Sequence, residues 1–400
     1  MSQGSLSRRR FAGALSAALG STFVEPARAA RAADVPPAPA PAARPVVNLS
    51  SNENPYGPSP GALEAMTRAQ AVAGRYPDED ETRAIEAIAR HHGVALERVV
   101  LGCGSGEILR LCDAAFLGPG RTVISAEPTF EAVLLYAKVT KAEAVKVPLT
   151  ADHRHDLAAM AAACDERTGL VYVCNPNNPT GTIVSAEEMR GFLARVPRTA
   201  VVLVDEAYHH FVESPSYSSV VEWIPEHPNL VVTRTFSKVY GMAGMRLGYA
   251  VATEENAKAL QAQASWSNAN AAVLAAAVAS LEDATLVARQ KQRLNGTRRR
   301  LVAELLRDER RIIPSETNFV MIHVGRDVQP VVDAFKERGI RVGRRFAAMP
   351  DWLRVTVGTP EETDAFLAAL REIVPAPAAA ARAATRLPAC GRIDRAASPL

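Results

Sequence analysis

The sequence predicts an α/β protein, with a large domain built on a mostly parallel central sheet and a smaller α+β domain. From about residue 99, short apolar runs alternate with amphipathic segments, a pattern typical of a parallel sheet covered by helices. The 400 residues are 48% hydrophobic and carry charges of both signs. This composition excludes a wholly disordered chain and provides enough apolar surface for more than one structural unit.

The expected strands of the large sheet are short, nearly continuous apolar runs, and helix-like stretches separate several of them. In such folds the functional groups are expected in loops beyond the strand ends. The strand-like runs are residues 99–101, 122–125, 144–147, 170–174, 201–204, 230–233 and 247–251, and the helix-like stretches are residues 106–117, 130–139, 156–163 and 185–195.

The second half begins with an Ala-rich helical region from residue 254 to about 308. We expect the smaller α+β domain to follow it and to be completed by the segment just after Val46. Its expected strands are residues 318–324, 341–342 and 353–357, and its expected helices are residues 328–338 and 361–373.

The net charge of +3 is concentrated at the two ends of the chain. Residues 1–45 hold six arginines against two acidic residues, and residues 376–400 hold four arginines against one. The rest is therefore acidic, which argues against nucleic acid as a partner. No uncharged run is long enough for a stable membrane span.

The first 32 residues have the pattern of an export signal of the twin-arginine type. Paired arginines precede Phe11, an uncharged stretch covers residues 11–24, and an Ala-x-Ala-like site follows near Ala29. This predicts a periplasmic or secreted protein that uses the twin-arginine export machinery; the alternative is a cytoplasmic protein with a misassigned start or an Ala/Arg-rich leader. We expect residues 33–45 to be a Pro/Ala-rich tether and residues 376–400 a disordered tail.

Five cysteines show no CxxC pair and no companion histidines at metal-binding spacing. We therefore expect neither a disulfide framework nor a metal site.

Three motifs that follow apolar runs contain the polar residues of a candidate functional site. NPNNPTG at 175–181 follows the apolar run LVYVC and makes a rigid loop at a strand end. DEAY at 205–208 follows VVLV, and an acid that emerges from a fully apolar strand needs a cationic partner. TFSKVYGMAGMRLGY at 235–249 places Lys238 and Arg246 eight residues apart among hydroxyls and glycines.

In this order, the motifs resemble the fold-type I pyridoxal-phosphate (PLP) aminotransferases of class I/II, most closely the histidinol-phosphate aminotransferase-like branch. The resemblance covers about residues 46–373 and includes SNENPYGPSP at 51–60, RYPD at 75–78, GCGSGE at 102–107, EPTF at 127–130 and LRVTVGT at 353–359. It implies an aspartate-aminotransferase-like fold of three parts. These are an N-terminal segment at 46–75 that packs on the small domain and active site, a large PLP-binding domain at 76–265, and an interdomain helix with the small domain at 266–375.

The resemblance also implies roles for the residues that bind the cofactor ring. Lys238 would bind PLP covalently and move the proton between the substrate α-carbon and the cofactor C4′ atom. Asp205 would pair with the pyridine nitrogen and keep it protonated, so that the ring withdraws electrons. Asn178 and Tyr208 would hydrogen-bond the 3′-oxygen, and Phe130 would stack on the ring.

The cofactor phosphate would lie on the turn Ser105, Gly106 and Glu107 at a helix start, where free N–H groups favour an anion. Thr235, Ser237 and Arg246 would add hydroxyls and a charge. Tyr76 matches a tyrosine that the neighbouring subunit donates in the family, which implies a homodimer with a shared active site.

Substrate residues are also implied. Arg354 matches the arginine that binds a substrate anion, usually the α-carboxylate. Asn52 and Tyr56 lie in the segment that folds over the site in relatives, and Asn318 is a further candidate. Histidinol-phosphate enzymes commonly have an arginine at the position that Gly343 occupies in the segment GIRVGRRF, residues 339–346. In this chain Arg344 is the next residue.

The implied function is transfer of an amino group, by ping-pong chemistry, between a 2-oxo acid such as 2-oxoglutarate and an amino acid or histidinol-phosphate-like amine. This is a reaction of amino-acid metabolism. Alternatives are a PLP-dependent decarboxylase of the threonine-phosphate type, a non-catalytic or regulatory PLP-binding protein on the same fold, and an amine-binding protein without turnover.

Overall fold

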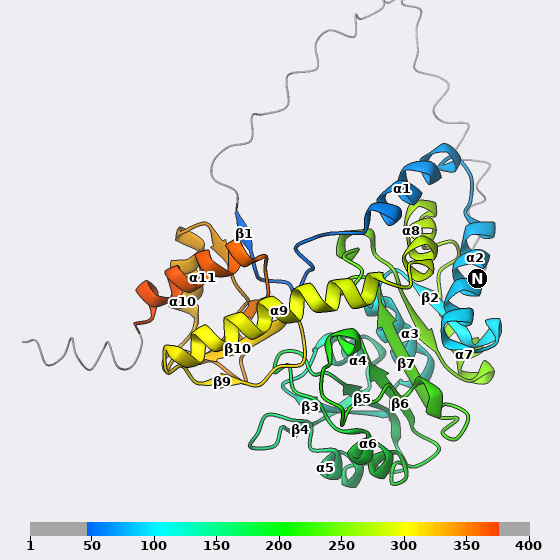
Figure 1. Cartoon of the computed structure of the whole chain (residues 1–400). Helices are drawn as coiled ribbons and strands as arrows, with labels where there is room; N and C mark the ends of the chain where they lie inside the picture. Colours follow the sequence, from blue (N-terminus) through cyan, green and yellow to red (C-terminus); the bar gives the residue numbers. More distant parts are fainter. Residues whose placement is uncertain (1–45, 376–400) are drawn as a thin grey trace, which may run out of the picture. The chain divides into compact units, whose positions relative to one another are not determined.

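A seven-stranded sheet lies at the centre of residues 99–251 (Figure 1). The structure is a computed structural model and describes residues 46–375. The strand order is β2-β8-β7-β6-β5-β3-β4, and only β8 runs antiparallel to its neighbours. The prediction of a mostly parallel sheet is thus confirmed. The bounds are β2 Val99–Gly102, β3 Thr122–Glu127, β4 Glu143–Pro148, β5 Thr168–Cys174, β6 Val201–Asp205, β7 Leu230–Thr235 and β8 Gly248–Val251.

The central strands β5, β6 and β7 are buried at every residue. Because both faces of such a sheet are covered, its strands read as continuous apolar runs and not as alternating ones. α6 shows how the flanking helices start: the Ser185 hydroxyl accepts from the backbone N–H of Glu188, and the Glu188 carboxylate accepts from that of Ser185. The flanking helices are α3 Ser105–Phe116, α4 Ala132–Thr140, α5 Leu157–Ala162, α6 Ala186–Leu193 and α7 Glu254–Gln261.

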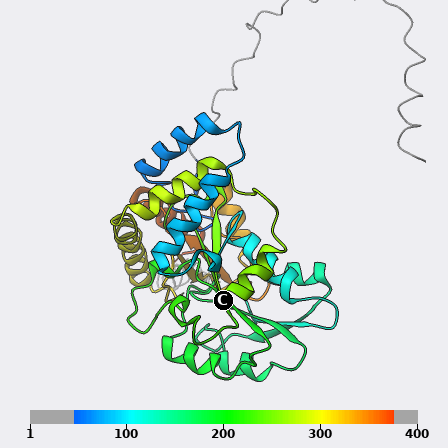
Figure 2. The same cartoon turned by 90° about the vertical axis from the view of Figure 1, so that its right-hand side faces the viewer.

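The helical region expected from residue 254 to 308 is divided into α7, α8 (Ala271–Glu282) and α9 (Leu286–Arg307). Polar residues make the breaks: the Asn270 side chain accepts from the Val273 N–H and starts α8, and the Asp283 carboxylate accepts from the Thr285 N–H just before α9. Two helices for which we made no prediction, α1 (Pro60–Ala69) and α2 (Asp78–His92), pack against α8 (Figure 2).

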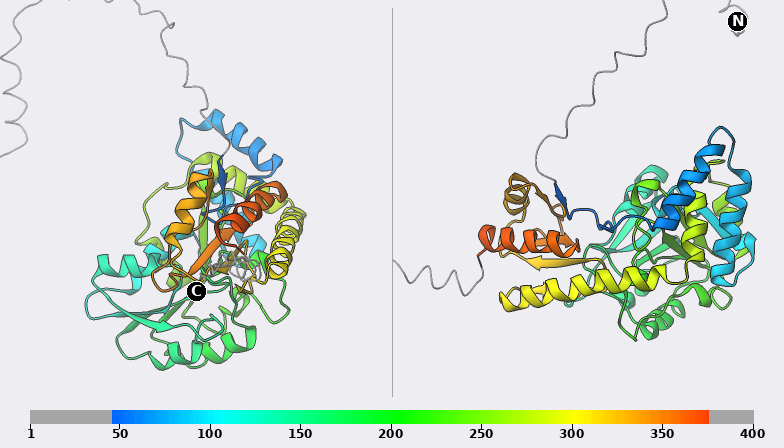
Figure 3. Two further views of the ribbon diagram at one scale, coloured as in Figure 1. Left: turned by 90° about the vertical axis from the view of Figure 1, so that its left-hand side faces the viewer. Right: turned by 45° about the horizontal axis from the view of Figure 1, so that its top comes forward.

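Residues 312–356 form a second, antiparallel sheet in the order β12-β10-β9, and a short parallel pair joins β1 to β11. Figure 3 shows α10 and α11 beside these strands. Their facing Phe335 and Phe366 rings stack with centroids 5.2 Å apart. The bounds are β1 Val47–Asn48, β9 Ile312–Ile313, β10 Phe319–His323, β11 Ile340–Arg341, β12 Trp352–Thr356, α10 Gln329–Glu337 and α11 Pro360–Ile373.

Helix α9 joins the two sheets (Figure 1). Its Asn295 amide donates to the Phe211 carbonyl at 2.8 Å, and its Arg298 guanidinium donates to the Thr317 carbonyl at 2.8 Å and pairs with Glu213 at 2.9 Å. These contacts hold the β10–β12 sheet beside the carboxyl ends of β5 to β7. The domain boundaries at 75/76 and 265/266 stay predictions.

The predicted export signal (1–32), tether (33–45) and tail (376–400) lie outside the described residues. Between residues 46 and 375, no single helix has the length and apolar character needed to cross a membrane. Only the bent pair of α8 and α9, which meet at 87°, reaches that length and composition together. The same range contains no cluster of three or more His, Cys, Asp or Glu residues that could hold a metal ion.

Candidate active site

A cavity of about 720 Å³ opens at the carboxyl ends of β5, β6 and β7. Each strand continues into one of the motifs identified from the sequence, so residues far apart in the chain meet there. The cavity is also lined by the first turn of α3, by the β12 residue Arg354 and by residues 50–53. The cavity is lined by 13 of the predicted residues: Asn52, Ser105, Gly106, Phe130, Asn178, Asp205, Tyr208, Thr235, Ser237, Lys238, Arg246, Arg344 and Arg354.

Asp205 is the last residue of β6 and is 3% exposed. Its carboxylate accepts from the Tyr172 hydroxyl and from the Ala207 N–H, both at 3.0 Å. No cation within residues 46–375 forms an ion pair with it, and burial raises its pKa to about 6. An ionised carboxylate in this place therefore lacks its counter-charge.

Lys238 lies in the loop after β7, and its side chain is partly exposed to the cavity. The Nζ atom donates to the Ser51 carbonyl at 3.2 Å and lies 5.5 Å from the centre of the Tyr208 ring. Desolvation, with a smaller contribution from Arg354, lowers its pKa to about 8. A substantial fraction is therefore neutral near pH 8, which makes Lys238 a candidate nucleophile and base.

The Tyr208 hydroxyl is the centre of an amide cluster. Asn52 donates to it at 2.9 Å and Asn178 at 3.4 Å, while burial raises the pKa of Tyr208 above its usual value. The Asn178 carbonyl oxygen in turn accepts from Arg354 at 2.6 Å. These contacts hold two amides and one hydroxyl together in the cavity lining.

The first turn of α3 and Arg246 together form an anion site. Gly104, with φ of +80°, precedes the helix, and a Cβ there would lie 2.1 Å from the Arg246 guanidinium. A glycine is thus required for Arg246 to lie against this turn. Arg246 donates to the Ser237 hydroxyl at 3.3 Å and has no carboxylate partner within residues 46–375. A helix N-terminus beside an unpaired guanidinium favours a dianion.

Arg354 is 8% exposed and donates to Asn178 and, at 2.8 Å, to the Ser50 carbonyl. Its Nε has no hydrogen-bond partner in the described part of the chain, and no carboxylate pairs with it. A buried cation without a counter-charge requires an anionic ligand. Gly343 packs directly on this arginine, since a Cβ at 343 would lie 2.7 Å from the Arg354 carbonyl oxygen.

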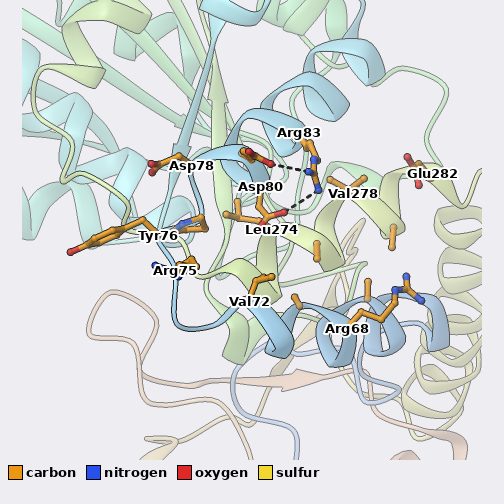
Figure 4. A pocket seen from close by; sticks show the side chains of 16 residues that line it. Arg68, Val72, Arg75, Tyr76, Asp78, Asp80, Arg83, Leu274, Val278 and Glu282 are labelled. Carbon is orange, nitrogen blue, oxygen red and sulfur yellow. Dashed lines mark hydrogen bonds and ion pairs between the residues drawn. The ribbon is translucent and has the colours of Figure 1, made fainter.

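Four predicted residues do not line this cavity; one of them, Asn318, is buried and donates to the Asn52 carbonyl at 3.0 Å. The Glu107 carboxylate faces its own loop, where it accepts from the Cys103 N–H at 2.6 Å and from Asn268. The Tyr56 ring packs under the Arg293 guanidinium at 3.5 Å. Tyr76 is 84% exposed and lines a different cavity, of about 670 Å³, between α1, α2 and α8 (Figure 4).

The sequence analysis missed other lining residues, among them Glu131, Val332 and Phe346. Glu131 directly follows the EPTF motif and pairs with Arg344 at 2.7 Å. Phe346 is the last residue of the GIRVGRRF segment. Its position directly after the two arginines was the sequence signal that could have identified it as a cavity residue. Val332 lies in α10, where helical periodicity alone cannot distinguish a cavity wall from a core position.

Residues 44–370 match the family model described as aminotransferase class I and II. The chain belongs to this family. A histidinol-phosphate aminotransferase of Halalkalibacterium halodurans is 40% identical over 331 residues, which are 82% of this chain and 89% of the relative. An aromatic amino acid aminotransferase of Cutibacterium acnes is 38% identical over 330 residues, 82% of this chain and 92% of the relative.

A solved histidinol-phosphate aminotransferase of Sinorhizobium meliloti, in complex with pyridoxal-5′-phosphate, has a TM-score of 0.78 at 28% identity, covering 83% of this chain and 91% of that one. The family and these likenesses confirm the predicted aspartate-aminotransferase-like fold, PLP as the cofactor and PLP-dependent aminotransferase activity.

The cavity fits PLP group by group. The unpaired Arg246 and the α3 turn suit the phosphate, and the uncompensated Asp205 suits a protonated pyridine nitrogen. Tyr208 and Asn178 suit the ring oxygen, and Lys238, with its lowered pKa, suits the aldehyde.

Proposed function

We propose that this aminotransferase moves the amino group of an amino acid, or of a histidinol-phosphate-like amine, to a 2-oxo acid such as 2-oxoglutarate. The observation that supports it most is the uncompensated buried arginine, Arg354, on the same cavity as Lys238 and Asp205. An α-carboxylate bound to Arg354 would place the substrate between these two groups.

The side chains then divide the work. When bound, PLP supplies an electron sink for negative charge at the substrate α-carbon. Asp205 holds the proton on the ring nitrogen, and its burial makes that charge pair stronger than it would be in water. Lys238 Nζ, with a pKa of about 8, would take the proton from the substrate α-carbon and deliver it to the cofactor C4′ atom.

A product analysis tests this proposal. The purified full-length protein is loaded with PLP and given amino acids or histidinol phosphate one at a time, followed by 2-oxoglutarate. We expect a keto product from the donor and glutamate from the acceptor, with loss of both in Lys238→Ala. Lys258→Ala is the matched control, because Lys258 is an exposed α7 lysine paired with Glu254. Release of carbon dioxide in place of a keto product would overturn the proposal in favour of decarboxylation.

We further propose a homodimer in which Tyr76 completes the active site of the neighbouring subunit. The 84% exposure of this tyrosine, beside a cavity with an apolar floor of Leu274 and Val278, supports a covered position in an assembly. The test mixes two separately inactivated variants, Tyr76→Ala and Lys238→Ala, under conditions that exchange subunits. Activity should return, because one site of each mixed dimer carries neither substitution; no recovery would refute a shared site.

We also propose export by the twin-arginine route. The support is the sequence pattern of residues 7–30, and a route that carries folded proteins would allow PLP to be captured before transport. Fractionation of cells that express the full chain should place the wild type in the periplasm or medium and the Arg9→Lys/Arg10→Lys variant in the cytoplasm. Equal distribution of the two would contradict the proposal.

A further inference from the structure

Besides Arg246 beside the α3 turn, two arginines line the reaction cavity, and their electrostatic surroundings differ. Arg354 is buried and has no carboxylate partner among the described residues. Arg344 is 57% exposed at its side chain and pairs with Glu131 at 2.7 Å. Of these two, Arg354 is therefore an unpaired buried positive charge, and Arg344 is an exposed charge neutralised by Glu131.

An apolar surface lies between these two arginines. The Phe346 ring centre is 5.2 Å from the Arg354 guanidinium and 4.5 Å from that of Arg344, so both cations approach the same ring. Val332 and Val342 extend this surface, and Phe130 faces the cavity beside Glu131. A substrate held by its α-carboxylate at Arg354 would extend its side chain over Phe346 toward the Arg344–Glu131 pair.

The pair joins separate parts of the fold. Glu131 is the residue before α4, which packs beside the large sheet, and Arg344 follows β11. Both ends are exposed, and exposed ion pairs are weak, so an incoming anion can compete with Glu131 for Arg344. A buried pair in this position would not exchange as easily.

We propose that Glu131 is a specificity-determining residue of this cavity. While it holds Arg344, the side-chain region is neutral and apolar, and it accepts amino donors with an uncharged, preferably aromatic or aliphatic, side chain. When a dicarboxylic 2-oxo acid enters, its distal carboxylate displaces Glu131 from Arg344. One cavity thereby takes both partners of a transfer reaction in turn; the inference rests on the proposed function.

The test measures binding of two unreactive probes to the PLP-loaded full-length protein, by cofactor absorbance or calorimetry. Glutarate carries two carboxylates, and 3-phenylpropanoate carries one carboxylate and an aromatic end. Glu131→Gln should increase the affinity for glutarate about twofold to fivefold, since it removes the carboxylate that competes for Arg344 through one exposed ion pair. Arg344→Gln should weaken glutarate about tenfold or more. Neither should change 3-phenylpropanoate binding by more than about twofold.

Two controls make the result specific. Arg345→Gln removes the adjacent arginine, which pairs with Asp327 at 2.8 Å and does not line the cavity, and it should leave both probes unchanged. In the Arg344→Gln background, Glu131→Gln should have no further effect on glutarate. An unchanged glutarate affinity in Glu131→Gln, or equal losses for both probes in Arg344→Gln, would overturn the inference. A wild-type protein that binds the probes but forms no keto product would overturn the proposed function instead.

Discussion

Replacing Asp205 by Asn should stabilise the protein without PLP and destabilise its PLP complex relative to wild type. The reason is that the carboxylate is buried beside Tyr172, and no cation in the described part of the chain pairs with it. Asparagine has nearly the same shape and can still accept one hydrogen bond. It carries no charge, so the folded chain no longer has to desolvate a carboxylate.

The magnitude follows from the pKa. Burial raises the pKa of Asp205 from 3.8 to about 6, so its ionised form costs roughly 3 kcal/mol at pH 7 relative to the unfolded chain. Because the folded-state pKa is the higher one, this cost is absent below pH 3.8 and present in full above pH 6. Asparagine loses one of the two hydrogen bonds, worth about 1 kcal/mol, which leaves a net gain of about 2 kcal/mol at pH 7.

The assay is urea unfolding at pH 7 and at the lowest pH where the fold persists, with and without saturating PLP. Asp205→Asn should be more stable than wild type only near pH 7 and only without PLP. Its PLP affinity should fall about 100-fold, which corresponds to the low end of the free energy lost when one partner of a buried charge pair is removed. Asp113→Asn is the matched control: Asp113 is also buried, with a pKa of about 6, but lies in α3 outside the cavity. It should leave PLP affinity unchanged. If Asp205→Asn destabilises both forms, the carboxylate serves the fold and the reasoning fails.

Three further predictions concern the same cavity. The rate of covalent PLP capture, followed by stopped-flow absorbance, should rise with pH and level off above about 8, because only neutral Lys238 reacts; a flat profile would contradict a lowered pKa. Arg354→Gln should raise the KM of amino and 2-oxo acids about tenfold to hundredfold in steady-state assays, while amines that lack an α-carboxylate stay within about twofold. Gly343→Ala should lower the free energy of unfolding in urea by about 1 to 3 kcal/mol, because its Cβ would lie 2.7 Å from the Arg354 carbonyl oxygen. Gly296→Ala in α9 has no heavy atom within 4 Å of its Cβ and should not destabilise.

The strands and the cofactor cavity were predictable from the sequence because their signals are local. The apolar runs of β5, β6 and β7 each end at a polar motif. Parallel strands bring their carboxyl ends to one edge, so Asn178, Asp205 and Lys238 meet there. The antiparallel β8 was not predictable, since a buried strand has the same apolar run in either direction.

Contacts made through tertiary structure were also beyond the sequence. Glu107 follows a helix start in a cofactor-binding motif, yet its carboxylate is drawn away by Asn268, 161 positions further along the chain. Glu131 and Arg344 are 213 positions apart, and nothing local marks them as a pair. Tyr56 carries the family motif but packs on Arg293 of α9. In each case a long-range partner decides where a polar side chain points.

Whether a buried charged side chain has a partner of opposite charge distinguishes residues that stabilise the fold from residues that bind a ligand. Arg234 and Glu206 are nearly inaccessible, but they pair at 2.9 Å, and Ser219 and the Val220 N–H complete the carboxylate's contacts. Asp205 directly precedes Glu206 and is also buried, yet no cation of residues 46–375 forms an ion pair with it. An unpaired buried charge costs several kcal/mol, and where it lines a cavity a bound group of opposite charge offsets that cost. By that criterion, Asp205 and Arg354 mark the two ends of one composite ligand, cofactor at the first and substrate at the second, with Lys238 between them.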